Sequence, residues 1–210
     1  MRIAVLAAHP DDAEIWCGGT ISKHSRQGDA IEIFGFFQQV PHRTNCARRS
    51  AEILGANYIS CSDAGPATLD RNYAKAISEF SPDLILTHWG LDSHPDHQRT
   101  FEIARRSIIE LVRLGGSPPR ALFSFTTYRN LGVHATFPAE FYIDVSAEWN
   151  NKLQAIRVHD DQFPEEIISD IEPLFKIHGQ IISREYAEPF CEVPIFGRLG
   201  SQLRSPHLLT

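Results

Sequence analysis

The chain has 210 residues and a formal net charge of −6, from 20 lysines and arginines against 26 aspartates and glutamates. Hydrophobic residues make up 42% and charged residues 22%, an ordinary globular composition that excludes wholesale disorder. The acidic balance argues against a nucleic-acid partner or an anionic membrane partner, because phosphate binding needs clustered lysine and arginine. At this length we expect one domain that spans residues 1–210.

The first apolar run, residues 3–8, is only six residues long, whereas a membrane-spanning helix needs about 18 or more. The run is also too short for a secretory signal, and His-Pro-Asp-Asp follows it at once. The four cysteines form no CxxC pair, a pattern typical of free thiols in a reducing compartment. We therefore expect a cytoplasmic protein.

Short β-rich runs alternate with helical stretches along the chain. Strands are expected at residues 2–8, 30–37, 57–61, 83–87, 121–126, 141–145 and 190–195, and helices at residues 18–26, 44–54, 70–80, 98–114, 147–158 and 167–178. Because parallel strands need helical crossovers, this alternation predicts an α/β fold, a Rossmann-like three-layer arrangement with a mostly parallel central sheet. In such sheets ligands bind beyond the carboxyl ends of the strands.

Two loops at such positions carry metal-binding side chains. Residues 9–14 read His-Pro-Asp-Asp-Ala-Glu, and residues 88–97 hold three of the ten histidines and two aspartates. Zinc binds imidazole nitrogens and carboxylate oxygens, and a catalytic zinc site has three protein ligands and one open position. His9 and Asp12, with one histidine from the second loop, would supply such a set.

Each loop also has an ordinary structural interpretation. In the first loop, proline can preset a turn and an aspartate can cap the next helix, and Asp96 can cap the helix after the second loop. Because the loops follow two strands of one predicted sheet, their combination favours a functional site. The remaining histidines, including His24, His42, His134 and His207, are expected at the surface.

Other common catalytic motifs are absent from the sequence. There is no G-x-G-x-x-G after the first strand, no phosphate-binding G-x-x-x-x-G-K-[ST] and no G-x-S-x-G nucleophile elbow. None of the cysteines lies in a nucleophile motif. Water activated by a bound metal is therefore the nucleophile that the sequence favours.

The motifs resemble those of the PIG-L/LmbE family of zinc-dependent de-N-acetylases, whose members act on N-acetylglucosaminyl conjugates. The matching segments are residues 8–14, 18–20, 92–97, 142–146, Lys152, 159–162 and 186–190. The resemblance thus covers nearly the whole chain in order, and the first two motifs are highly specific in combination. Cys46, Asp161 and Ser183 depart from the usual family residues, which are Glu, Ser and Gly.

The resemblance implies roles for the residues of both loops. It implies that His9, Asp12 and His97 hold zinc, although the same ligand types also accept iron or cobalt. It further implies that Asp11 is the general base and that cationic His94 is the electrostatic partner or acid. The family would therefore place catalysis and metal binding on these two loops.

Further roles follow from the same resemblance. Asp96 would support His94, while Arg43, Asp63 and Arg129 are candidates for substrate binding. We expect a zinc-dependent hydrolase that removes the N-acetyl or N-acyl group from an N-acetylglucosaminyl-type conjugate, a small-molecule partner. The alternatives are a catalytically silent sugar- or nucleotide-binding module, or another metallohydrolase such as a phosphoesterase. The sequence also allows a homo-oligomer.

Overall fold

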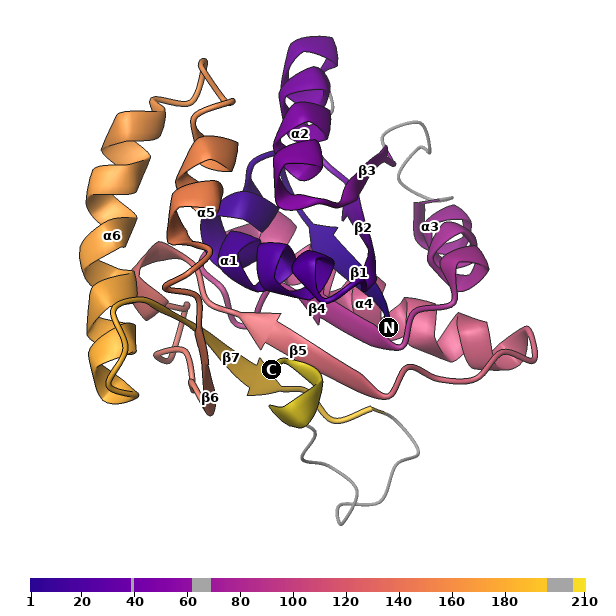
Figure 1. Cartoon of the computed structure of the whole chain (residues 1–210). Coiled ribbons are helices and arrows are strands. Elements are labelled where there is room, and N and C mark those ends of the chain that lie inside the picture. The colour runs from indigo at the N-terminus through magenta and orange to yellow at the C-terminus, as the bar shows by residue number, and fades with distance from the viewer. Residues whose placement is uncertain (39, 62–68, 196–205) are drawn as a thin grey trace.

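The structure, a computed structural model, describes residues 1–38, 40–61, 69–195 and 206–210. The strands in these ranges are β1 (Arg2–Ala7), β2 (Ala30–Gly35), β3 (Asn57–Ser60), β4 (Leu84–Thr87), β5 (Ala121–Phe125), β6 (Phe141–Asp144) and β7 (Ala187–Glu192). They form one sheet in the order β3-β2-β1-β4-β5-β7-β6 (Figure 1). The first five strands along this order are parallel, whereas β7 is antiparallel to both β5 and β6.

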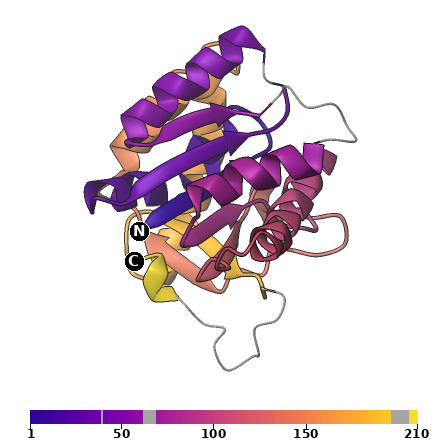
Figure 2. The same cartoon turned by 90° about the vertical axis from the view of Figure 1, so that its right-hand side faces the viewer.

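Helices cover both faces of the sheet (Figure 2). They are α1 (Asp12–Arg26), α2 (Pro41–Leu54), α3 (Leu69–Phe80), α4 (Pro95–Arg113), α5 (Trp149–Ile156) and α6 (Pro164–Ile181), with short 3-10 helices η1 (Tyr128–Asn130) and η3 (Pro206–Leu208). Helices α1, α2, α5 and α6 lie on one face, and α3 and α4 lie on the other. The predicted three-layer α/β fold with a mostly parallel sheet is confirmed.

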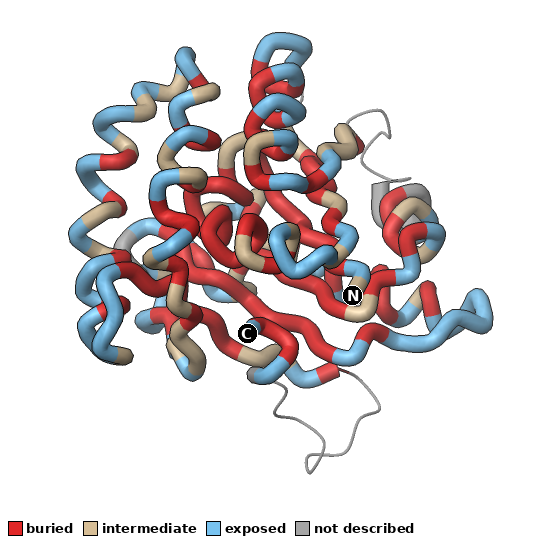
Figure 3. Tube along the Cα trace, viewed as in Figure 1, coloured by how far each residue is buried: buried red, intermediate tan, exposed pale blue. Residues whose placement is uncertain are grey.

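The central strand β1 is buried on both of its faces, and the sheet around it is almost continuously buried (Figure 3). Val5 packs into the core beneath α1 and α5, whereas Leu6 packs into the core beneath α3 and α4. This two-sided burial explains why the sequence of β1 is apolar without alternation. No helix in the described ranges is long and apolar enough to cross a membrane.

Three helices begin earlier than the sequence predicted, each by three residues. Helices α2, α4 and α6 begin at Pro41, Pro95 and Pro164, not at residues 44, 98 and 167. Proline is favoured in the first turn because its φ angle is already helical and its missing N–H has no partner there anyway. The periodic apolar pattern starts only in the second turn, and this is why the pattern alone placed these starts too late.

Helix α1 begins at Asp12, six residues before the predicted start, and it is kinked at Cys17, where φ is −139° and ψ is 21°. The kink frees backbone amides at the start of its second half. The amides of Gly19 and Thr20 donate hydrogen bonds to the carboxylate of Glu188, at 2.9 Å and 2.8 Å. The predicted helix from residue 18 was therefore only this second half, whose amino end carries a carboxylate partner.

Strand β7 spans Ala187–Glu192, whereas the sequence predicted residues 190–195. The prediction missed the first part of the strand because a charged residue, Glu188, occupies its interior. Lys152 of α5 makes this burial possible: its Nζ donates to Glu188 Oε1 at 2.6 Å, and both side chains are fully buried. The same Nζ lies 3.7 Å from the ring centroid of Phe175, a cation–π contact.

Three of the histidines expected at the surface are buried, namely His24, His159 and His178. His24 of α1 is 1% exposed, and its Nδ1 lies 2.7 Å from Asp29 Oδ2. Asp29 also pairs with the amino group of Met1, so the three residues join the start of β1 to the turn that follows α1. The surface prediction for His24 was wrong because a partner in the next turn permits its burial, whereas His134 and His207 are exposed.

We expect Lys152→Met to lower the free energy of unfolding by about 3–5 kcal/mol, because it leaves the Glu188 carboxylate buried without its cation. Urea denaturation measures the loss. Glu165→Gln is the matched control, since it breaks an exposed pair with Arg157 and should cost far less. Equal losses in the two variants would contradict the role given to the buried pair.

Candidate metal centre and active site

The two predicted loops meet at one edge of the sheet because β1 and β4 are adjacent parallel strands. Strand β1 also pairs with β2 on its other side. From β1 the strand order therefore runs in two directions, toward β3 on one side and toward β5 on the other, so the connecting helices lie on opposite faces of the sheet. His9 follows β1 and His88 follows β4. The backbone amide of Ala8 donates to His88 Nε2 at 3.0 Å, a bond that joins the two loops directly. The site therefore lies where α/β sheets commonly bind ligands.

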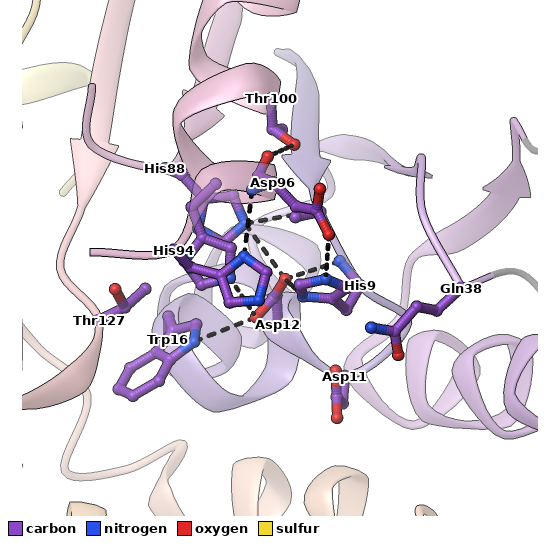
Figure 4. Close-up of polar contacts among 12 residues, drawn as sticks. His9, Asp11, Asp12, Trp16, Gln38, His88, His94, Asp96, Thr100 and Thr127 are labelled. Atoms are coloured by element: carbon purple, nitrogen blue, oxygen red, sulfur yellow. Dashed lines mark hydrogen bonds and ion pairs between the residues drawn. The ribbon is translucent and has the colours of Figure 1, made fainter. Parts of the chain in front are cut away.

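His9, Asp12 and His97 lie together at the centre of this region, and all three are buried. His9 Nδ1 lies 3.3 Å from Asp12 Oδ2, and His97 Nε2 lies 3.5 Å from Asp12 Oδ1. One donor atom from each residue falls within 4.8 Å of the others. Figure 4 shows Asp12 between His94 and His9, with dashed lines from its carboxylate to the surrounding side chains. These distances suit three ligands of one small cation.

The chemistry of these donors also fits a metal. His97 Nε2 is buried and has no hydrogen-bond partner among the described residues, although it faces Asp12. The other ring nitrogen, Nδ1, lies 3.1 Å from Asp92 Oδ1. A metal-binding imidazole commonly has a carboxylate against its second nitrogen, which orients the ring. A cation at the first nitrogen would give this buried atom its missing partner.

The site favours positive charge. Burial alone would raise the pKa of Asp12, but the surrounding imidazoles, among them cationic His97, hold it well below its usual value. Burial opposes the charged form of His97, but Asp12 and Asp92 raise its pKa to about 10. The protein thus keeps ionised carboxylates in a buried position, where a proton or a metal ion can neutralise them.

His88 forms a further group of possible metal donors with Asp92 and His97, but the first loop already engages one of its ring nitrogens. Its ring stacks on that of His97, with centroids 3.9 Å apart. Its Nε2 accepts the hydrogen bond from the Ala8 amide, so the lone pair of that nitrogen is already used. Burial and the nearby His97 lower the pKa of His88 to about 4, so the ring is neutral. We infer that His88 holds the first loop in place.

His94, rather than Asp96, caps helix α4. His94 Nδ1 accepts the backbone amide of Asp96 at 3.1 Å. The Asp96 carboxylate lies 3.1 Å from His9 Nε2 in the first loop. Its expected support of His94 is limited to its charge, which raises the pKa of that ring. Thr100 Oγ1 donates to the backbone carbonyl of Asp96 at 2.8 Å and fixes this turn.

His94 is neutral in this arrangement. Burial lowers its pKa, and the adjacent His97 and His9 lower it further. Because Nδ1 accepts a backbone hydrogen bond, the single ring proton is on Nε2. The lowered pKa favours a neutral ring that offers one N–H donor, whereas the sequence-based expectation was a cationic ring.

Asp11 occupies the N-cap position of α1, yet its side chain makes no capping hydrogen bond. It accepts a hydrogen bond from Arg43 Nη2 at 2.9 Å, and Gln38 accepts a second bond from the same guanidinium. Burial and the neighbouring Asp12 raise the pKa of Asp11, whereas Arg43 lowers it. The capping interpretation thus fails for Asp11, whose side chain is held beside the cluster by a cation.

A cavity of about 480 Å³ opens over these residues, a size typical of small-molecule sites. Asp11, Arg43 and His94 line its polar side, and Ile167 and Ile171 of α6 line an apolar side. A ligand in this cavity would therefore have one polar part against the loops and one less polar part against α6.

The loop between α5 and α6, residues 157–163, reaches the same cavity. Gln162 lines the cavity, and His159 is buried in an ion pair with Glu14 of α1. The Glu14 carboxylate raises the pKa of His159 against the effect of burial. Glu14 and His159 lie in two of the segments that resemble the PIG-L/LmbE motifs, residues 8–14 and 159–162. Their ion pair gives both residues a structural role beside the cavity.

The other predicted residues have different outcomes. Asp63 lies outside the described residues, as does the side chain of Arg129, whose backbone belongs to η1. Asp92 was not among the predicted site residues, although it begins the motif at residues 92–97. Its carboxylate contacts His97, accepts the His94 amide at 2.8 Å and accepts the Thr127 hydroxyl. Its position in the motif indicated a functional role, but the sequence could not show that it contacts His97.

The first half of the chain matches a known family. Residues 4–108 match PIG-L, described as GlcNAc-PI de-N-acetylase. The chain belongs to this family. The resemblance seen in its motifs is thereby confirmed, and family membership supports an amide-hydrolysing enzyme.

Relatives of this PIG-L member extend the comparison over most of its length. Diacetylchitobiose deacetylase of Thermococcus kodakarensis is 27% identical over 223 residues, 92% of this chain and 83% of the relative. The structure of N,N'-diacetylchitobiose deacetylase from Pyrococcus horikoshii is similar, with a TM-score of 0.72 and 23% identity over 92% of this chain and 84% of that one. GalB, the 4-carboxy-2-hydroxymuconate hydratase from Pseudomonas putida, has a TM-score of 0.76 and 20% identity over 95% and 98% of the two chains. Both structural likenesses concern the fold.

Proposed function

We propose that this PIG-L member is a metal-dependent deacetylase that removes the N-acetyl group from an N-acetylglucosaminyl-type sugar conjugate. The observation that carries the proposal is the buried set of His9, Asp12 and His97 beside Asp11 at the cavity. Family membership supports amide hydrolysis, and the diacetylchitobiose deacetylase relative supports an N-acetylated amino sugar as the substrate class.

In this proposal His9, Asp12 and His97 hold the cation, which we expect to be zinc. When bound, such a cation lowers the pKa of water to about 7 and polarises a carbonyl group. Two imidazole nitrogens and one carboxylate leave a coordination position open, as catalysis requires. Asp92 orients His97 through its Nδ1, and Asp96 contacts the second nitrogen of His9.

Asp11 is the general base of the proposed reaction. Its carboxylate lies beside the ligand Asp12 but is not itself one of the three proposed ligands, because Arg43 binds it instead. It can therefore take a proton from water. Its pKa is raised from the usual aspartate value mainly by burial, which makes it a stronger base than an exposed aspartate. One carboxylate thus binds the metal while the adjacent one moves the proton.

His94 serves as a hydrogen-bond donor through the proton on its Nε2. A neutral N–H aimed at the cavity stabilises negative charge that develops on the amide oxygen. Because His94 has only this proton, giving it up would leave an imidazolate, so Asp11 returns its captured proton to the departing amine. We place Arg43 at the sugar as well, since it lines the cavity beside Asp11.

The reaction is tested by measuring acetate release from N,N'-diacetylchitobiose and from other N-acetylglucosaminyl conjugates, together with the metal content of the purified protein. We expect acetate and a free amine in equal amounts. Phosphate release from phosphoesters would favour a phosphoesterase. Absence of metal together with no acetate from any conjugate would favour a silent sugar-binding module.

Asp11→Asn should lower turnover by about 10²–10⁴, the usual contribution of general acid–base catalysis, while metal content and thermal stability stay unchanged. The asparagine keeps the shape of the side chain but cannot accept a proton. Steady-state kinetics of acetate release measure the effect. Near-normal turnover in this variant would remove Asp11 from the role of base.

His97→Ala should reduce the amount of bound metal, because it removes one of three protein ligands. Elemental analysis after dialysis measures the metal-to-protein ratio. His207→Ala is the control, since His207 is exposed and distant in the sequence from both loops. If His97→Ala keeps the same ratio as the control, His97 is not a ligand.

Asp92→Asn should weaken metal affinity by about 10–100-fold, the usual effect of removing a carboxylate behind a metal-binding histidine. The variant keeps the size of the side chain and can still accept the amide of His94. Competition with a metal-binding dye measures the affinity. Wild-type affinity would mean that Asp92 only stabilises the loop.

A further inference from the structure

We propose that His42, Cys46, Asp160 and Asp161 form a second, zinc-class metal site, separate from the proposed catalytic set. His42 and Cys46 lie on α2, and the two aspartates lie in the loop 157–163. The donor atoms of His42, Cys46 and Asp160 fall within 4.8 Å of one another. No residue is shared with the cluster of His9, Asp12 and His97, so the proposal does not rest on the proposed function.

The geometry brings these donors to one point. His42 and Cys46 are four residues apart on α2 and therefore lie on the same helix face. His42 Nε2 lies 3.8 Å from Cys46 Sγ, 2.8 Å from Asp160 Oδ1 and 4.0 Å from Asp161 Oδ1. Bonds of about 2.0–2.3 Å place neighbouring ligands of a tetrahedral zinc roughly 3–4 Å apart. Small rotations of exposed side chains satisfy this spacing.

The same geometry argues against a cysteine nucleophile. In a nucleophile–histidine–aspartate triad the two partners contact opposite nitrogens of the imidazole. Here Cys46 and Asp160 both face Nε2 of His42. One nitrogen cannot accept the thiol proton while it donates to the carboxylate. A cation between the three groups satisfies all of them, because each then contributes a lone pair.

The donor types select the class of metal. A thiolate beside an imidazole suits zinc, cobalt or copper(I), whereas calcium and magnesium prefer oxygen ligands alone. Burial raises the pKa of Cys46, and the carboxylates of Asp160 and Asp161 raise it further. The thiol is thus protonated in the metal-free protein, and binding of a cation transfers that proton to solvent.

The site is accessible to ions in solution. The Cys46 side chain is buried at the base of the proposed site, whereas the side chains of His42 and Asp160 are 59% and 73% exposed. Cys46 and Asp161 are far apart in the sequence, yet both lie against the same histidine.

A cation here would fix two segments that line the catalytic cavity. His42 precedes Arg43, which binds Asp11, and Asp161 precedes Gln162. Both Arg43 and Gln162 line the cavity. The metal would therefore clamp the first turn of α2 to the loop 157–163 and set the width of that side of the cavity.

Cobalt(II) titration of chelator-treated, reduced protein tests the proposal. Cobalt bound to a thiolate gives a charge-transfer absorption in the near ultraviolet, and the proposed catalytic set contains no sulfur. We expect this absorption in the wild type and in His97→Ala, with its complete loss in Cys46→Ala and a loss or strong weakening in His42→Ala. Cys61→Ala is the matched control for removing a buried thiol and should keep the absorption.

Two results would overturn the proposal. One is the absence of the thiolate absorption in wild-type protein at cobalt concentrations that saturate the catalytic site. The other is its persistence in Cys46→Ala, which would assign it to a different thiol. His42 is exposed, so His42→Ala is expected to fold, and a melting temperature measured without metal verifies this. The readout is independent of deacetylase activity.

Discussion

Asp12 places a carboxylate charge in a fully buried position where β1 and β4 end, and such a charge is stable only with donors or positive charge around it. The backbone amide of His9 donates to it at 2.7 Å and Trp16 Nε1 donates at 3.3 Å. The imidazoles of His9, His88 and His97 also lie within 3.5 Å of it. The two loops must therefore approach one another, and the site is organised around this carboxylate and the positive charge it requires.

A second buried carboxylate, Glu188, has a comparable role deeper in the fold. It receives the amides of the second half of α1 and the ammonium group of Lys152. The kink at Cys17 separates the two halves of α1, so its first turn serves the site while its second half is fixed to β7. Rigid support of this kind keeps Asp11 and Asp12 at fixed positions.

The cavity has two kinds of wall, and this division bears on which substrates fit. The loops after β1 and β4 supply charged groups, while α6 supplies isoleucine side chains. Helix α2 and the loop 157–163 form the edge between these walls, through Arg43 and Gln162. The cluster at His42 lies next to both residues, so the edge of the cavity is the part of the molecule where metal binding would alter substrate access.

Much of the fold followed from local pattern. The apolar run of β1 and the strand–helix alternation predicted a parallel sheet, and parallel pairing then predicted that the motifs at residues 9–14 and 88–97 would meet. The prediction failed where a partner distant in sequence permits burial, as for Glu188 and His24, and where proline starts a helix before its apolar stripe begins.

The sequence by itself determined the α/β class, the family and the identity of the residues that converge, because periodicity and motif order are local properties of the chain. Only the tertiary structure decided how these side chains pair. It placed Asp96 against His9 and Asp92 against His97, and its burial of His94 lowers the pKa of that ring. It also joined His42 to Asp160 across 118 positions. Such contacts depend on the relative placement of whole elements, which no single segment specifies.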